Sequence, residues 1–329
     1  MTPLYDAIRA YAAQKPTRFH MPGHKGSFLP VSELQSIAPL DVTEVEPTGA
    51  LFPGGEPFDT AQKLWAERFG MDNCLFLTGG STLGLHAALA LFCRPGDQVL
   101  IDRGCHRAVY NALALLDLEP VYLPRPWRAG EGIAGPISPQ DVPALGQSAL
   151  LFTNGLDPRR VRQMTSVFGS SSPSYPMMIS LDCARDYLDG KGSEEYRRVA
   201  RRTAALRAAF PSLHEGELRL DPTRLTLTSP DGNALAQALE GENIWPEMAD
   251  SGHVVLILTA QDSEDDLHRL EEALQRHRDL LGTPPILPPP PMPKSVRSLR
   301  EALFAPVERL PLEYCLGRVA AGQLAPYPP

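Results

Sequence analysis

The residues most able to do chemistry begin with a glycine and hydroxyl cluster, Gly79, Gly80, Ser81 and Thr82, within FLTGGSTLGLHAALALFC. A strand-like apolar run precedes the cluster, and an apolar pattern with helical spacing follows it. Glycine lets the backbone approach a ligand closely, and N–H groups at a helix start attract phosphate. The stretch is neither a Walker A loop nor GxGxxG, so a phosphate site and an ordinary capped turn both fit it.

Three histidines and a lysine are further candidates. His106 follows a strand-like run, where α/β proteins place their sites, and it could stack on a flat cofactor ring or merely cap a helix. His20, His24 and Lys25 lie in HMPGHKG, which is too rich in glycine and proline for regular structure. No Asp or Cys joins these histidines at ligand spacing, so we predict no metal site, and an ordinary polar loop remains the alternative.

The composition is that of a globular protein, with 43% apolar and 21% charged residues among 329. A formal charge of −8 disfavours a general nucleic-acid binder. The sequence has no run of about 18 apolar residues, so we expect no membrane span. The N-terminus lacks a signal-peptide pattern, and the five cysteines are widely spread without a CxxC pair. These features favour a cytoplasmic protein with free thiols.

Strand and helix patterns alternate through the first half of the chain, which predicts an α/β layered domain. The expected strands are 73–78, 98–104, 119–124 and 148–154, and the expected helices are 3–14, 57–69, 82–93, 106–117, 158–167, 174–189 and 193–209. A further helix start is expected near Ser138.

The last third reads as a small α+β domain. Strand material in LRLDPTRLTLTS and at 253–260 alternates with helices in GNALAQALEGE and DSEDDLHRLEEALQRHRDLLG. The last helix is expected to start at a capping pair, Ser263 and Asp266, and to end at Gly282. Its buried stripe comprises Leu267, Leu270, Leu274 and Leu281.

Several motifs in a fixed order resemble the Orn/Lys/Arg decarboxylase family. They are TPLYDAIRAYAAQKPTRFHMPGHKG, DVTEVEPTGALF, FLTGGSTLG, DRGCHRAVYNALALLDLEPVYL, SSSPSYPMMISLDCAR, IWPEMADSGHVVLILT and FAPVERLPLEYCLGRVAAGQLAPYPP. The resemblance implies an enzyme of the aspartate-aminotransferase fold (fold type I) that uses pyridoxal 5′-phosphate (PLP). It implies an αβα large domain and a smaller C-terminal α+β domain.

The resemblance also implies roles for the candidate residues. Gly80, Ser81 and Thr82 would hold the PLP phosphate, and His106 would stack on the pyridine ring. Ser171 and Ser172 in SSSPSY would reach the cofactor phosphate of the partner subunit in a homodimer. His20, His24 and Lys25 would help to build the substrate entrance.

Two motifs of the family are absent from the sequence. PLP decarboxylation needs a lysine that carries the cofactor as a Schiff base and an acid that pairs with the pyridinium nitrogen. The family places them in S-x-H-K and DEAHG motifs, and neither motif occurs here. The five lysines, none in such a context, are Lys15, Lys25, Lys63, Lys191 and Lys294.

The absent stretch has a predicted position. SPQDVPAL resembles the family before it and GQSALLF after it, so the junction lies near Leu145–Gly146 and removes roughly two βαβ units. In this fold the lost strands lie in the middle of the large sheet, with 98–104 and 119–124 on one side of them. The strands at 73–78 and 148–154 lie on the other side, so the sheet should be incomplete and expose edges. The family pattern also continues past Pro329.

We therefore predict five regions: an N-terminal arm (1–30), a PLP-binding large domain (31–190), a small domain (191–283), a proline-rich linker (284–294) and a clipped family segment (295–329). The resemblance implies a basic amino acid decarboxylase of polyamine metabolism, impaired by the loss of its lysine and acid. The alternatives are a non-catalytic PLP- or phosphate-binding pseudoenzyme, a partner of a full-length paralogue, and a non-functional deletion product.

Overall fold

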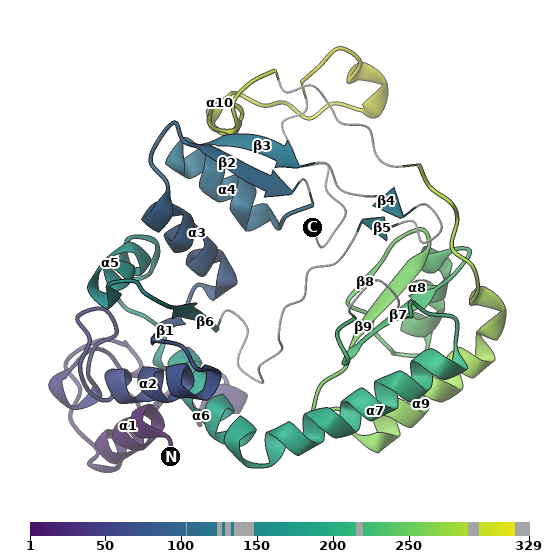
Figure 1. Ribbon diagram of the computed structural model, residues 1–329. Helices are drawn as coiled ribbons and strands as arrows, with labels where there is room; N and C mark the ends of the chain where they lie inside the picture. The colour runs from purple at the N-terminus through teal and green to yellow at the C-terminus, as the bar shows by residue number, and fades with distance from the viewer. Residues whose placement is uncertain are drawn as a thin grey trace. The chain divides into compact units, whose positions relative to one another are not determined.

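The structure is a computed structural model that describes residues 1–102, 104–123, 127–128, 133–134, 148–214, 220–288 and 296–319. The chain divides into two compact units, and Figure 1 labels their helices and strands. The first unit contains residues 1–97, 108–118 and 142–190, and the second contains residues 98–107, 119–141 and 191–329. The helix start expected near Ser138 and the junction at 145/146 lie outside the described residues.

The first unit is built on an antiparallel pair of strands. Strand β1 (Asn73–Leu77) pairs with β6 (Ala149–Thr153), and Leu75 lies opposite Leu151. The helices of this unit are α1 (Pro3–Ala13), α2 (Phe58–Phe69), α3 (Gly80–Phe92), α4 (Arg107–Leu116), α5 (Pro158–Phe168) and α6 (Tyr175–Tyr187). Helices α2 and α6 contact β1, and α3 packs on α5 and β6.

The core of the first unit joins segments far apart in the sequence. Phe58 and Tyr175 meet edge to face with ring centroids 5.7 Å apart. The indole N–H of Trp65 donates to the carbonyl of Leu181 at 3.1 Å, so this large side chain is buried with its polar atom paired. Helix α2 ends at Gly70, whose left-handed φ of 63° suits a glycine C-cap.

The second unit contains a parallel pair of strands and the small domain. Strand β2 (Gln98–Asp102) pairs with β3 (Glu119–Leu123), with Leu100 opposite Val121. Short strands β4 (Trp127–Arg128) and β5 (Ile133–Ala134) form an antiparallel pair. Near the C-terminal end lies a short helix, α10 (Leu299–Phe304).

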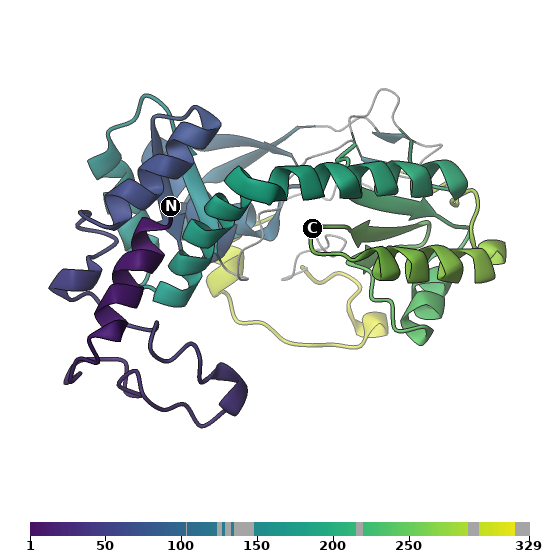
Figure 2. The ribbon, with the colours of Figure 1, turned by 90° about the horizontal axis from the view of Figure 1, so that it is seen from below.

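The small domain has an antiparallel sheet of order β7-β9-β8, comprising Arg224–Thr228, His253–Ile257 and Met248–Ala249. Its helices are α7 (Ser193–Ala209), α8 (Gly232–Gly241) and α9 (Glu264–Arg276). Figure 2 shows α7 and α9 side by side, joined by the Arg198–Glu264 ion pair. Leu225, Leu227 and Leu274 are fully buried in its core.

The helices and strands predicted within the described residues are confirmed apart from their ends. Helix α3 starts at Gly80, so Ser81 and Thr82 lie in its first turn rather than before it. The prediction that the last long helix ends at Gly282 is wrong. Helix α9 ends at Arg276, a 3-10 turn follows (Arg278–Leu280), and the N–H of Gly282 donates to the carbonyl of Thr228 instead.

The predicted division of the large sheet is also confirmed in its pairings. Strands 98–102 and 119–123 form one two-stranded sheet, and 73–77 and 149–153 form another, among the residues that the structure describes. Two strands cannot bury both faces and both edges, so side chains such as Leu100 remain exposed. In the described ranges no helix is both long and apolar enough to cross a bilayer.

Candidate functional site

The glycine and hydroxyl cluster lies where β1 passes into α3. Gly79 is the N-cap of α3, and Gly80 has a left-handed φ of 68°. The N-cap makes no side-chain hydrogen bond, and the first turn holds no acidic residue. Ser81 is exposed and Thr82 is half-buried. The first N–H groups of α3 are thus not capped by a side chain, which is the arrangement that receives an anion.

Close packing positions this turn. A Cβ on Gly79 would come within 2.9 Å of Leu83, and a Cβ on Gly84 would come within 2.8 Å of Leu77. Glycine at 84 therefore lets α3 lie directly against Leu77 at the end of β1, and glycine at 79 leaves room for the Leu83 side chain one turn further along α3. The local sequence places the N-terminus of α3 at the carboxyl end of a strand, where α/β proteins bind ligands.

His106 lies between β2 and α4, and its side chain is exposed. It belongs to the second unit, whereas Gly80, Ser81 and Thr82 belong to the first. The stacking of His106 on a ring held by the phosphate turn therefore stays a prediction.

Ser171 and Ser172 lie in the exposed turn between α5 and α6. The Ser170 hydroxyl donates to the Ser172 carbonyl at 3.2 Å, and the Ser172 N–H donates to the Ser170 hydroxyl oxygen at 3.1 Å. This local turn holds Ser171 at the surface. Its contact with the cofactor of a second subunit stays a prediction.

The structure brings His20, His24 and Lys25 together in one folded loop. The Lys25 ammonium donates to the His20 carbonyl at 2.6 Å. His24 Nδ1 accepts from the Gly26 N–H at 3.0 Å, so its Nε2 carries the hydrogen that points to Asp41 Oδ2 at 3.1 Å.

His20 has the opposite tautomer. Its Nδ1 lies 2.6 Å from the Met21 carbonyl oxygen, which can only accept, so its Nε2 accepts from the Tyr11 hydroxyl at 3.0 Å. Both rings use both nitrogens, one within the loop and the other toward Tyr11 of α1 or Asp41, which favours a positioning role over metal binding. No group of three or more metal-binding side chains gathers within the described ranges.

None of the described lysines follows a strand along the chain. Lys15 follows α1, and Lys25 lies in the N-terminal loop. Lys63 lies on α2, 3.6 Å from Glu67 and well exposed, and Lys191 lies in the kinked segment Leu188–Gly192 between α6 and α7. Lys294 lies outside the described residues. No described lysine thus has the setting expected of a cofactor-binding lysine.

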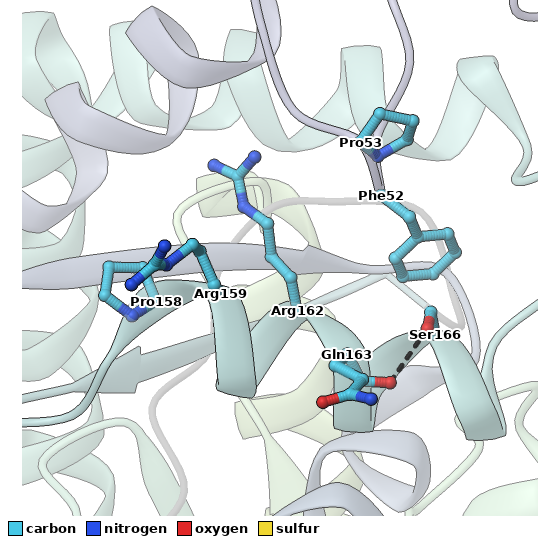
Figure 3. A pocket seen from close by; sticks show the side chains of 7 residues that line it. All are labelled: Phe52, Pro53, Pro158, Arg159, Arg162, Gln163 and Ser166. Carbon is cyan, nitrogen blue, oxygen red and sulfur yellow. Dashed lines mark hydrogen bonds between the residues drawn. The ribbon is translucent and has the colours of Figure 1, made fainter.

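A cavity of about 400 Å³ lies between the loop after residue 51 and one face of α5, a site that we did not predict from the sequence (Figure 3). Its lining residues are Phe52, Pro53, Pro158, Arg159, Arg162, Gln163 and Ser166. One feature of the sequence could have indicated this cavity: the polar residues of α5 that line it are spaced so that they share one face of the helix. Each arginine already faces a carboxylate: Arg162 donates to Asp59 at 2.6 Å, and Arg159 lies 3.4 Å from Asp157. The cavity is thus close to neutral.

Solved structures identify the class of fold. The constitutive lysine decarboxylase of Escherichia coli matches with a TM-score of 0.72 at 18% identity, covering 85% of this chain and 61% of its own length. A structure of SPT with PLP matches with a TM-score of 0.52 at 12% identity, covering 67% of this chain and 76% of its own. The chain thus has the fold of the PLP-dependent fold type I enzymes.

Sequence comparisons show which family the chain resembles. Residues 2–150 match the Orn/Lys/Arg decarboxylase major domain. An arginine decarboxylase of Bacillus subtilis is 24% identical over an alignment that covers all of this chain and 89% of that protein. These matches show that the chain resembles the Orn/Lys/Arg decarboxylases, the family that the motifs predicted.

The alignment with the B. subtilis protein also bears on the predicted gap. It extends over 435 positions, whereas this chain has 329 residues, so the relative carries residues that this chain lacks. The excess agrees in scale with the loss of two βαβ units, each of about 30 residues or more. Its position at 145/146 stays a prediction.

Proposed function

We propose that this chain is a decarboxylase relative that binds the phosphate of PLP without covalent attachment and does not decarboxylate basic amino acids. The observation that carries the proposal is the contrast between two halves of one site. The turn at Gly80, Ser81 and Thr82 is open to an anion, whereas no described lysine follows a strand.

The phosphate half fits the cofactor. The uncapped N–H groups of α3 and the exposed Ser81 hydroxyl can donate to phosphate oxygens, and the helix dipole favours the negative charge. Thr82 is half-buried and would donate from the inner side of the turn. His106 would cover the ring, and Ser171 and Ser172 would approach from a second copy in a homodimer.

The ring half does not fit a catalyst. PLP, when bound, supplies an electron sink for the charge left by loss of CO₂, but only while an acid keeps its ring nitrogen protonated. The sequence lacks both the DEAHG acid and the S-x-H-K lysine, so we expect no turnover of lysine, ornithine or arginine. Substrate recognition by His20, His24 and Lys25 would then serve binding only.

A binding and labelling experiment tests this function. The purified chain is titrated with PLP, and its absorbance and tryptophan fluorescence are followed, with inorganic phosphate as competitor. Borohydride reduction and peptide mapping then report any covalent attachment, and release of labelled CO₂ reports turnover. We expect saturable binding that phosphate displaces, with no labelled peptide and no CO₂.

Variants of the phosphate turn provide the control. A double Ser81→Ala and Thr82→Val change should weaken PLP binding about a hundredfold or more by removing two hydrogen bonds to a charged group. The conservative Ser81→Thr keeps the hydroxyl and should bind nearly as well as the wild type. A borohydride-fixed lysine with CO₂ release would instead establish a decarboxylase. Absence of both binding and a cooperative melt would point to a deletion product.

A further inference from the structure

The two outer edges of the parallel pair β2–β3 differ in how readily they could pair with a further strand. Pro120 lies within β3, and proline has no N–H to offer, so it occurs in strands mainly at sheet edges. Strand β2 has no proline or glycine, and its first four residues, Gln98, Val99, Leu100 and Ile101, carry no charge. Among the described residues, β2 is hydrogen-bonded to β3 alone.

The two faces of this strand pair also differ, in how far their side chains are exposed. Ile101 is buried, whereas Leu100 is 62% exposed and its partner in register, Val121, is 39% exposed. A complete fold type I sheet would continue beyond β2. Here a strand with three apolar residues, Val99, Leu100 and Ile101, has no partner on its other edge among the described residues, and the exposed Leu100 lies at its centre.

We propose that the free edge of β2 pairs with β2 of a second copy of this chain, giving a four-stranded sheet of order β3-β2-β2-β3. A two-fold axis between the two β2 strands, level with Leu100, makes the pairing antiparallel and closed, because each copy uses the same edge. Leu100 then faces Leu100 of the other copy, and Val99 faces Ile101 on the opposite side of the sheet.

The sequence of β2 suits this self-pairing. Gln98 is uncharged, so the outermost pairs of the register bring no like charges opposite one another. The central pair of leucines extends the apolar stripe that Leu100 and Val121 form within one copy. Native sheets block such edges with charges or proline, and β2 has neither in its first four residues.

Sedimentation of the full chain over a range of concentrations tests the proposal, with Leu100→Lys as the variant. Two ammonium groups would then face each other across the axis, and like charges directly opposite are unfavourable, so association should weaken by about tenfold or more. Leu100 is mostly exposed, so this change leaves the fold of one copy unaltered. The matched control is Val121→Lys, which places the same charge on the same face, one strand away from the edge.

A cross-linking experiment reads the edge directly. Opposed Cβ atoms in an antiparallel pair lie about 5 Å apart, so Leu100→Cys should form an intermolecular disulfide under mild oxidation much faster than Val121→Cys or the wild type. The proposal is overturned if the wild type shows no association, if Leu100→Lys associates as the wild type does, or if the two cysteine variants cross-link equally. Selective binding of β2 to a different protein would overturn it as well.

Discussion

Asp182 in α6 accepts a hydrogen bond from the backbone N–H of Leu4 at 3.0 Å, although 178 residues separate them. The same carboxylate oxygen accepts from the N–H of Tyr5 at 3.2 Å. Asp182 is fully buried, and Arg185 lies 3.9 Å from it. A remote carboxylate thus caps the N-terminus of α1, where the helix dipole favours negative charge.

Removal of this cap should release α1 from the first unit. We expect Asp182→Ala to destabilise this unit by about 1–3 kcal/mol, because the N–H groups of Leu4 and Tyr5 lose their acceptor, whereas Arg185 keeps its ion pair with Asp189. Asp182→Asn keeps an oxygen for the Leu4 and Tyr5 N–H groups and should lose less. Urea unfolding and hydrogen exchange of the α1 amides measure both losses. Equal exchange of α1 in the wild type and Asp182→Ala would contradict the capping role.

The titration of Asp182 should give a pH dependence of stability. Burial raises the pKa of Asp182 above its ordinary value, while the Tyr5 and Leu4 N–H groups and Arg185 act against this and the Asp6 charge adds to it. Because the folded pKa exceeds the unfolded one, the contribution is complete below the unfolded pKa and declines as pH rises through the folded pKa.

The comparison with Asp182→Asn isolates this effect, since asparagine does not titrate. The stability of the wild type relative to Asp182→Asn should fall as pH rises from about 4 and become constant above the folded pKa. Urea unfolding of both proteins at several pH values measures the difference. A difference that grows in favour of the wild type with rising pH would refute the raised pKa.

A carboxylate of the small domain should behave in the opposite way. A hydrogen bond from Arg276 is the main cause that lowers the pKa of Glu242 to about 2, and His277, 2.7 Å away, adds to it. The contribution of Glu242 to stability is therefore present above the unfolded pKa of about 4.5 and is lost as pH falls toward about 2.

Glu242→Gln should remove the part of the loss of stability in acid that comes from protonation of Glu242. Thermal melts of the wild type and Glu242→Gln between about pH 2 and 7 should differ most at neutral pH and converge in acid. The exposed Glu240→Gln makes the same change of charge two residues earlier and serves as the control. Parallel curves for the wild type and Glu242→Gln would show that the ion pairs contribute nothing.

The start of α9 should depend on one hydroxyl. The Ser263 hydroxyl oxygen accepts from the Asp266 N–H at 3.1 Å, and the Asp266 carboxylate accepts from the Ser263 N–H at 3.1 Å. We expect Ser263→Ala to cost about 1 kcal/mol of unfolding free energy, and Ser263→Thr, which keeps the hydroxyl, to cost much less. Equal losses in the two variants would mean that packing, not capping, sets this helix start.

The sequence alone predicts what depends on neighbours in the chain. The capping pair Ser263 and Asp266 and the glycine turn before α3 are visible because backbone geometry and hydrogen bonding over three or four residues decide them. The family motifs further indicate which strands pair, and β1–β6 and β2–β3 form as expected. The end of α9 was misjudged, because Gly282 bonds to Thr228 on another strand instead of closing the helix.

Tertiary structure alone decides what depends on partners far along the chain. Neither the cap that Asp182 provides for α1 nor the contact of Arg162 with Asp59 beside the cavity has a local signal, since 178 and 103 residues separate the partners. Packing determines which distant groups share a buried space, and only there does a carboxylate become a cap or an apolar strand such as β2 become an open edge. The motifs thus indicate the family that the chain resembles and the phosphate turn. Only the tertiary structure shows that the edge of β2 lacks a described partner and that the Asp182 carboxylate caps α1.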